Sequence, residues 1–214
     1  MGYTANDKGL FLMISGMKMQ NLLSILLLGV IGYMVLVFII WSRQDKYVFY
    51  PEREIRSTPA DIGLKYENFT VTTTDGERIA GWFIYRDDGK NEPAPVLLCC
   101  HGNAGNIGDR VWEAEIISKL GFNVVLFDYR GYGESTGTPS EDGIYKDGMA
   151  IWKYLHETKK IKSDNIIIYG KSLGTTVAIE LARQVDAGGL IVESGFTSAE
   201  DMAKIMFPFF PCRL

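Results

Sequence analysis

Histidine and cysteine are both scarce in this chain of 214 residues. Two histidines, His101 and His156, are too few for a histidine-rich metal site, so we expect no metal and no organic cofactor. Three cysteines cannot form a disulfide framework, and Cys99 and Cys100 are adjacent within an apolar run. The sequence therefore gives no sign of a metalloprotein or of a disulfide-stabilised scaffold.

Basic charge is also in short supply, because 22 lysines and arginines face 26 aspartates and glutamates, for a net charge of −4. Lys8, Lys18 and Asp7 are the charged residues among the first 42, so the acidic excess lies in the remainder. An acidic domain without a basic stripe argues against nucleic acid as the main partner. A hydrophobic fraction of 47% excludes wholesale disorder. A mean hydropathy of +0.03 excludes a protein with many membrane spans.

One long uncharged run lies near the N terminus, where residues 22–41 read LLSILLLGVIGYMVLVFIIW. As a helix with a rise of about 1.5 Å per residue, this run spans a hydrocarbon core of about 30 Å. A cleavable signal peptide has a shorter apolar region, so we predict a retained single-pass membrane helix over 22–41. The residues before it (1–21) are assigned to an N-terminal tail and those after it (42–65) to a juxtamembrane linker. Basic residues flank both ends, which leaves the side of the membrane undetermined.

Beyond the linker, strand and helix patterns alternate. Two β-rich runs, 66–73 and 78–85, flank Asp75-Gly76 and predict a hairpin. Short, continuously apolar runs are typical of strands that are covered on both faces, and they occur at 96–100, 123–127, 166–169 and 190–192. Helical patterns occur at 110–120, 141–158 and 173–185. This order predicts an α/β fold over residues 66–214, with a mostly parallel sheet flanked by helices.

The segment Gly170-Lys171-Ser172-Leu173-Gly174 has the pattern G-x-S-x-G and lies between a predicted strand and a predicted helix. A sharp turn there would lift the Ser172 hydroxyl above the sheet edge, and a side chain at Gly170 or Gly174 would strike a neighbouring element. Leu173 opens the helix, so its backbone N–H is free to face an oxyanion. The alternative is a glycine-rich turn with a capping serine, but the position between strand and helix favours a nucleophile.

A second loop, His101-Gly102-Asn103-Ala104-Gly105-Asn106, directly follows the strand at 96–100. Its glycines let backbone amides approach a ligand, so Asn103 or Ala104 can supply a second oxyanion donor. His101 could serve as a base, but a histidine that ends such a strand more often holds the loop by hydrogen bonds.

A third loop, residues 128–135, follows the strand at 123–127. We expect Asp128 and Arg130 to form a structural charge pair beneath it. The spacing Gly131-x-Gly133 begins a dinucleotide fingerprint, but the next glycine, Gly137, comes one residue too late.

In order, HGNAGN, DYRGYGES, GKSLGT and the ESGFTS of residues 193–198 resemble the motifs of the α/β-hydrolase fold. More narrowly, with YPER at residues 50–53, they resemble the BEM46-like (ABHD13-like) serine hydrolases, which are commonly membrane-anchored and often classed as serine-aminopeptidase-like. The resemblance covers about residues 43–214. It implies Ser172 as nucleophile, with the amides of Leu173 and of Asn103 or Ala104 as oxyanion hole. The implied reaction is hydrolysis of an ester, thioester or amide in a small acyl or peptide-like substrate, through an acyl-enzyme.

The sequence departs from this family in its catalytic triad, which in this fold runs in the order serine, acid, histidine. No histidine follows Ser172, and His156 lies on a predicted helix, where we expect it at the surface edge. Glu193, at the end of a predicted strand, could serve as the triad acid as in some hydrolases, but the family resemblance implies a structural role for it. We therefore expect a chain truncated at its C terminus, without the last strands and without the triad acid and histidine. The alternative is a non-catalytic, membrane-tethered binding or scaffold protein that has kept the fold and lost the triad.

Overall fold

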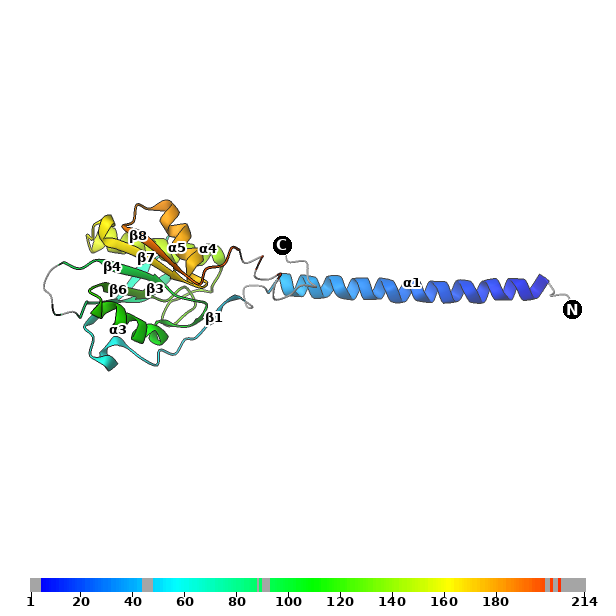
Figure 1. The fold of residues 1–214 in the computed structure, drawn as a ribbon. Helices are drawn as coiled ribbons and strands as arrows, with labels where there is room; N and C mark the ends of the chain where they lie inside the picture. The colour runs from blue at the N-terminus through cyan, green and yellow to red at the C-terminus, as the bar shows by residue number, and fades with distance from the viewer. Residues whose placement is uncertain are drawn as a thin grey trace. The chain divides into compact units, whose positions relative to one another are not determined.

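The computed structural model describes residues 5–43, 48–87, 89, 93–198, 201 and 204, with side chains described from residue 18 onward. These residues belong to two units, an N-terminal helix and a folded domain (Figure 1).

The N-terminal helix, α1, runs from Ala5 to Trp41. Within it, Lys18–Trp41 is long and apolar enough to cross a membrane, with a mean hydropathy of 2.9. The prediction placed a helix at 22–41 and a tail at 1–21, whereas the structure continues the helix back to Ala5. The added residues contain no proline that would end the helix and include several leucines and methionines, which favour it.

The domain is built on a six-stranded sheet in the order β2-β3-β6-β4-β7-β8 (Figure 1). Its strands are β2 (Tyr66–Thr72), β3 (Arg78–Ile84), β4 (Val96–Cys100), β6 (Asn123–Phe127), β7 (Ile166–Lys171) and β8 (Gly189–Glu193). The pairs β2–β3 and β3–β6 are antiparallel, and β4–β6, β4–β7 and β7–β8 are parallel. The predicted hairpin and the mostly parallel sheet are therefore confirmed. A separate short parallel pair joins β1 (Tyr50–Pro51) to β5 (Ala104–Gly105).

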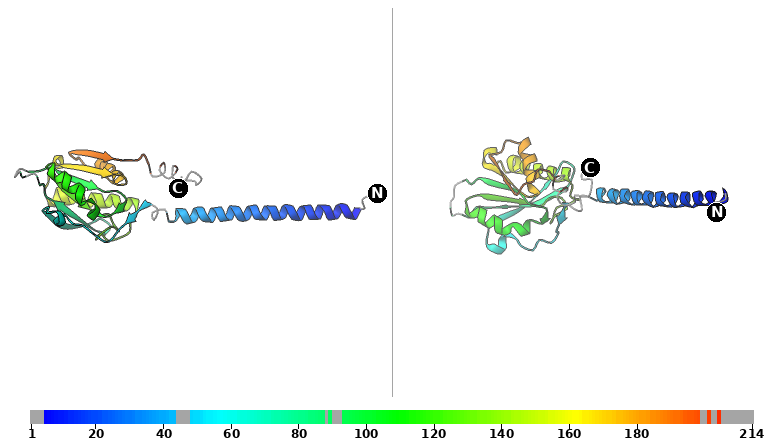
Figure 2. Two further views of the ribbon diagram at one scale, coloured as in Figure 1. Left: turned by 60° about the horizontal axis from the view of Figure 1, so that its bottom comes forward. Right: turned by 45° about the vertical axis from the view of Figure 1, so that its right-hand side comes forward.

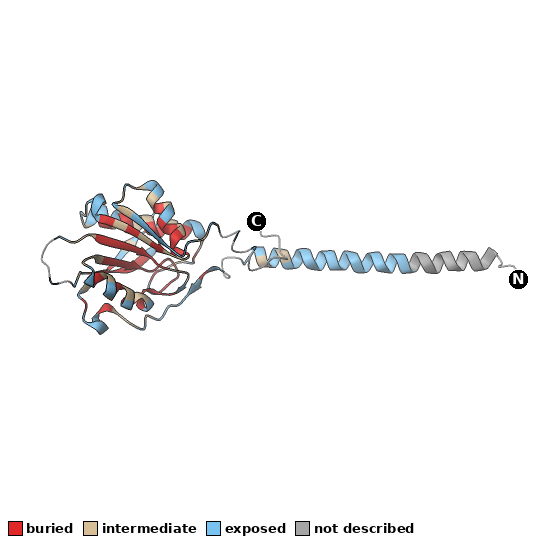
Figure 3. Cartoon of the chain, viewed as in Figure 1, coloured by how far each residue is buried: buried red, intermediate tan, exposed pale blue. Residues whose placement is uncertain are grey.

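Helices cover both faces of the sheet (Figure 2). They are α3 (Val111–Lys119), α4 (Glu141–Lys153), which continues as a π-helix over Tyr154–Thr158, and α5 (Gly174–Gln184); short 3₁₀ turns lie at Pro59–Ile62, Ile107–Arg110 and Ser163–Asn165. The central strands β3, β4 and β6 are buried between these layers, whereas β8 at the edge of the sheet is mostly exposed (Figure 3). Along β4 successive side chains enter different clusters, because a strand points alternate residues to opposite faces.

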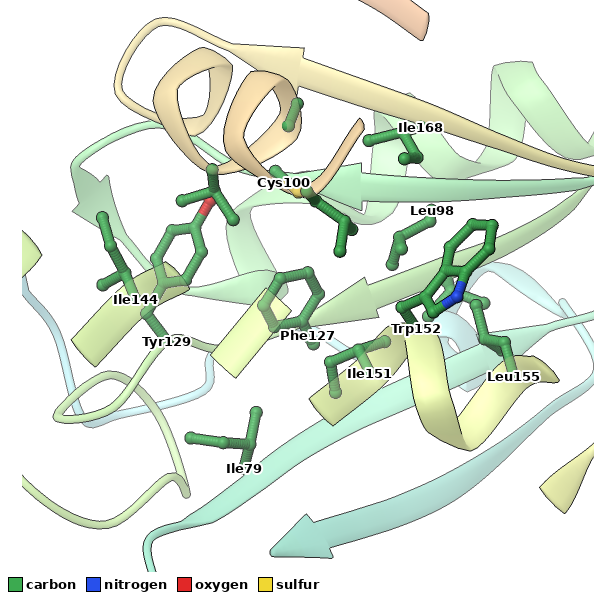
Figure 4. Close-up of a cluster of buried hydrophobic side chains, with 14 of the residues drawn as sticks. Ile79, Leu98, Cys100, Phe127, Tyr129, Ile144, Ile151, Trp152, Leu155 and Ile168 are labelled. Carbon is green, nitrogen blue, oxygen red and sulfur yellow. The ribbon is translucent and has the colours of Figure 1, made fainter. Parts of the chain in front are cut away.

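The larger cluster joins the sheet to α4 and α5. Leu98, Phe127, Ile151 and Trp152 pack within it, as Figure 4 shows. The second cluster places α3 against the other face, where Val111 packs with residues of β4 and β6. The loops that follow β4, β6 and β7 all leave the C-terminal ends of these parallel strands, at one edge of the sheet.

The folded domain begins before β2. The sequence pattern predicts a linker at 42–65, but Phe49 and Leu64 are 7% and 6% exposed and belong to the two core clusters. β1 also lies in this segment and pairs with the loop after β4. Residues 48–64 are thus an integral part of the domain.

Candidate active site

Ser172 lies in the turn between β7 and α5 and adopts a left-handed backbone with φ of 52°. A non-glycine residue in this region is strained by about 1–3 kcal/mol and needs support from its surroundings. The Ser172 N–H donates to the carbonyl of Glu193 (2.9 Å), and Thr175 donates to the Ser172 carbonyl from both N–H (3.0 Å) and hydroxyl (2.7 Å). These three bonds hold the strained residue, and its side chain remains partly exposed.

The two glycines of the motif lie where no side chain fits. A Cβ on Gly174 would lie 2.0 Å from the carbonyl oxygen of Cys100, and one on Gly170 would lie 2.6 Å from the Cβ of Ala178. The first clash is with backbone, which cannot move away as a flexible side chain can. The close approach of α5 to β4 and β7 therefore requires glycine at both positions.

The HGNAGN loop (residues 101–106) lies directly beside this turn. β4 and β7 are neighbours, with Cys100 paired to Gly170, so the loop and the turn leave the same edge of the sheet. A Cβ on Gly102 would lie 3.7 Å from the Cβ of Ser172. Among the described residues, the N–H groups of Leu173 and Asn103 have no hydrogen-bond acceptor. Free backbone donors thus lie both in the Ser172 turn and in the adjacent loop.

Asn103 contributes its main chain to this region, since its side chain is engaged elsewhere. Its Nδ2 donates to the carbonyl of Val48 (3.0 Å). Its carbonyl accepts from the Tyr50 N–H (3.0 Å) and from the Tyr132 hydroxyl (2.7 Å). Ala104 is exposed, and its carbonyl accepts from Arg110 (2.8 Å).

His101 is buried beneath the same loop. Its Nδ1 lies 2.7 Å from the carbonyl of Gly102, which can only accept, so Nδ1 carries the proton. Burial lowers the pKa of His101 to about 4, so the ring is neutral at pH 7. The ring packs against Tyr129 with centroids 4.4 Å apart, and the Tyr129 hydroxyl donates to the His101 carbonyl (2.9 Å). These contacts tie the histidine to the loop.

Asp128 and Arg130 do not form the expected pair. The Arg130 guanidinium instead binds Asp147 on α4 (2.9 Å) and Asp75 in the hairpin turn (3.0 Å). Asp128 accepts a hydrogen bond from the Ile107 N–H (3.0 Å) and lies 3.7 Å from Nε2 of His101. The two side chains leave the backbone toward different neighbours, and no local signal marked Asp75 and Asp147 as the partners of Arg130.

An ion-pair network lies on the other side of the Ser172 turn. Lys171 bridges Glu113 on α3 (2.7 Å) and Glu193 at the end of β8 (3.3 Å). The Tyr169 hydroxyl donates to the Glu193 carboxylate (2.5 Å), and hydrogen bonds from Tyr169 and Lys171 lower the pKa of that carboxyl. The sequence suggested neither partner of Lys171. Glu193 supports the Ser172 turn twice, through this network and through its own carbonyl.

His156 is exposed on the π-helix after α4, with its ring stacked on Trp152 at a centroid distance of 6.3 Å and its Nδ1 3.1 Å from the carbonyl of Ile161. Within the described part of the chain, no cluster of three or more histidine, cysteine, aspartate or glutamate residues could hold a metal ion.

Comparison with known proteins agrees with this architecture. Residues 95–192 match the family model for the alpha/beta hydrolase fold. The chain is 36% identical over 176 residues to protein bem46 of Schizosaccharomyces pombe. The alignment covers 78% of this chain and 58% of bem46. The chain belongs to the BEM46-like α/β hydrolases. The resemblance stated from the sequence motifs is thereby confirmed.

This α/β hydrolase has further relatives with named activities. It is 38% identical over 142 residues to lysophosphatidylserine lipase ABHD12 of Bos taurus. This alignment covers 60% of this chain and 35% of that lipase. Among solved structures, the Pyrococcus furiosus esterase Pf2001 matches with a TM-score of 0.57 at 26% identity, over 75% of this chain and 69% of the esterase. The hydrolase spans about three fifths of the length of bem46.

Proposed function

We propose that this α/β hydrolase is a membrane-anchored serine hydrolase with Ser172 as its nucleophile. The observation that carries the proposal is the strained backbone of Ser172 at the strand-to-helix turn, held by three hydrogen bonds and flanked by glycines that cannot be replaced. Such a turn costs free energy, and a strained residue held in this way is typical of a functional position.

The proposed reaction transfers an acyl group to Ser172 and then to water. The hydroxyl loses its proton to a base, and Oγ bonds to the carbonyl carbon. The carbonyl oxygen, now negative, accepts hydrogen bonds from the N–H of Leu173 and from that of Asn103 or Ala104. The leaving group departs with a proton, and water then hydrolyses the acyl-enzyme.

The proposed substrate is a carboxylic ester of a small acyl or peptide-like molecule, with thioesters and amides as related classes. The names of two relatives support the ester, since one is a lysophosphatidylserine lipase and the other an esterase. The apolar stretch of α1 supports a membrane anchor, which would hold the domain close to acyl substrates in a bilayer.

No residue of this sequence is assigned as the general base. His101 is buried and donates to its own loop, and His156 is exposed at the end of α4. Because neither of these histidines is placed as a base for Ser172, a membrane-tethered binding or scaffold protein is the one other candidate function. An externally supplied base distinguishes the two functions.

The test is labelling of the detergent-solubilised protein by a fluorophosphonate probe over a series of imidazole concentrations. Small imidazole can act as the base at the partly exposed Ser172, so we expect the labelling rate to rise by about tenfold or more. Ser172→Ala is the control and should not be labelled at any concentration. A folded wild-type protein that stays unlabelled throughout would overturn the hydrolase and leave the scaffold.

A further inference from the structure

We propose that residues 48–53, here called the strap, position the backbone donors of the HGNAGN loop, so that the reactivity of Ser172 depends on the segment between the N-terminal helix and the sheet. The inference rests on the proposed function of Ser172. It assigns to the strap residues a positioning role, since they touch the loop and not the reacting atoms.

The strap is bonded to the loop along its length. Tyr50 donates its N–H to the Asn103 carbonyl (3.0 Å), and Glu52 donates its N–H to the Gly105 carbonyl (3.2 Å). In the opposite direction, Nδ2 of Asn103 donates to the carbonyl of Val48 (3.0 Å). β1 of the strap and β5 of the loop are thus a parallel pair that lies outside the main sheet.

These bonds determine where an amide N–H points. A trans peptide is planar, so the carbonyl of one residue and the N–H of the next point in opposite directions. The Asn103 carbonyl is held by Tyr50 of the strap and by the Tyr132 hydroxyl (2.7 Å). The Ala104 N–H is therefore directed away from the strap. In the same way, the bond from His101 to the Gly102 carbonyl directs the Asn103 N–H.

The strap itself is fixed on its other side. The Phe49 ring is 7% exposed within the larger core cluster. The Arg53 guanidinium donates to the carbonyls of Gly133 (3.3 Å) and Ser135 (2.5 Å), and the Glu52 carbonyl accepts from the Gly133 N–H (2.9 Å). The strap thus lies between the HGNAGN loop and the 128–135 loop and joins them. Removing the Arg53 donors should release it toward solvent.

A misdirected oxyanion donor is costly, since the loss of one such donor lowers the rate by about 10²–10³ in enzymes of this chemistry. Release of the strap shifts the donor without removing it. We therefore expect a smaller loss, of about tenfold or more, in the step that forms the bond to Ser172. Probe binding before that step should change little.

The experiment compares Arg53→Met with Arg53→Lys and with the matched control Arg56→Met, in the whole chain and at fixed imidazole. Arg56 lies three residues beyond the strap, and its exposed side chain pairs, among the described residues, with the surface carboxylates of Glu52 and Glu54. Labelling rates over a range of probe concentrations give kinact and KI separately. Hydrogen exchange of residues 102–106 reports the loop without requiring any activity.

We expect R53M to lower kinact by about tenfold with KI unchanged and to speed exchange in residues 102–106 but not in α5. R53K should restore part of both, and R56M should match the wild type. Folded R53M with wild-type kinact and wild-type loop exchange overturns the proposal. If R53M unfolds, Asn103→Ala takes its place, because it removes the bond from the Asn103 side chain to the Val48 carbonyl of the strap and keeps the main-chain N–H. If the wild type is not labelled at all, the proposed function fails. The role of the strap is then decided by hydrogen exchange alone, and unchanged exchange of residues 102–106 in R53M, or in the variant that replaces it, overturns that role.

Discussion

Ser172 differs from an ordinary capping serine in a combination of features rather than in one. Positive φ angles also occur at Lys160 and Ser194, so strain by itself does not single out a nucleophile. At Ser172 the strained angle coincides with partial exposure of the residue, a free N–H on Leu173 and the adjacent HGNAGN loop. Each feature is common in proteins, whereas their coincidence at one residue supports the proposed chemistry.

Burial shifts the pKa values of the neighbouring side chains His101 and Asp128 in opposite directions. Burial lowers the pKa of His101 from 6.5 to about 4 and raises that of Asp128 from 3.8 to about 7. Between about pH 4 and pH 6.5 the folded pair therefore holds one proton, on Asp128. The unfolded pair also holds one, on His101. Folding then neither binds nor releases a proton at this pair, and the pair adds no pH dependence to the free energy of unfolding.

Asp128→Asn should expose the contribution of His101. The amide oxygen can still accept from Ile107, but the carboxyl proton is gone. Between about pH 4 and pH 6.5, His101 is protonated in the unfolded state and neutral in the folded state. The unfolded state therefore binds more protons in this range. The free energy of unfolding of D128N, relative to the wild type, should rise with pH across this range by about 1.4 kcal/mol per unit. Urea denaturation at several pH values measures this difference, and parallel pH profiles would contradict it.

Helix α5 begins unusually close to β4, and this contact shapes the site. A Cβ on Gly174 would lie 2.0 Å from the Cys100 carbonyl oxygen and 2.6 Å from that of His101. Both atoms belong to the strand and loop that carry the proposed second oxyanion donor. The start of the helix and the start of the HGNAGN loop therefore have to move together.

Gly174→Ala should destabilise the domain by about 1–3 kcal/mol or more, because the added methyl overlaps backbone that cannot yield without disturbing β4. It should also abolish labelling of Ser172. Gly189→Ala is the matched control, since its Cβ would meet only the Ile167 side chain at 3.9 Å. Thermal melting and probe labelling of both variants measure the effect; equal melting temperatures for G174A and wild type would refute this account of the turn.

Across the whole domain, the sheet ends in a strand that is largely uncovered. β8 is the last strand in the sheet order, and Leu190, Ile191 and Val192 are 42%, 47% and 46% exposed. An exposed apolar edge strand presents unpaired backbone groups and is a template for pairing with another chain. Within the described residues, this edge is the part of the domain best suited to self-association.

The domain without α1, residues 43–214, should therefore self-associate in solution, and Ile191→Lys should reduce the association by placing a charge on the edge. Leu120→Lys is the control, since Leu120 is 72% exposed but lies at the end of α3, away from β8. Light scattering after size-exclusion chromatography measures the molar mass. A monodisperse, monomeric wild-type domain would contradict the prediction.

The sequence by itself determined the features that depend on neighbours along the chain. The hairpin around Asp75-Gly76, the buried strands, the helices and the apolar run near the N terminus are all patterns of a few to twenty residues. The turn at Ser172 belongs with them, because a strand, two glycines and a helix start are adjacent in the chain. The family resemblance followed from the order of four such local motifs.

Only the tertiary structure decided the contacts between distant segments. Arg130 bonds to Asp75 and Asp147, which are 55 and 17 residues away, and no local pattern distinguishes them from other aspartates. The strap bonds to Asn103 across 55 residues of sequence. Residues predicted to form a linker therefore belong to the folded domain. Such partners are chosen by where the folded sheet brings two loops together, and that depends on the packing of the whole core.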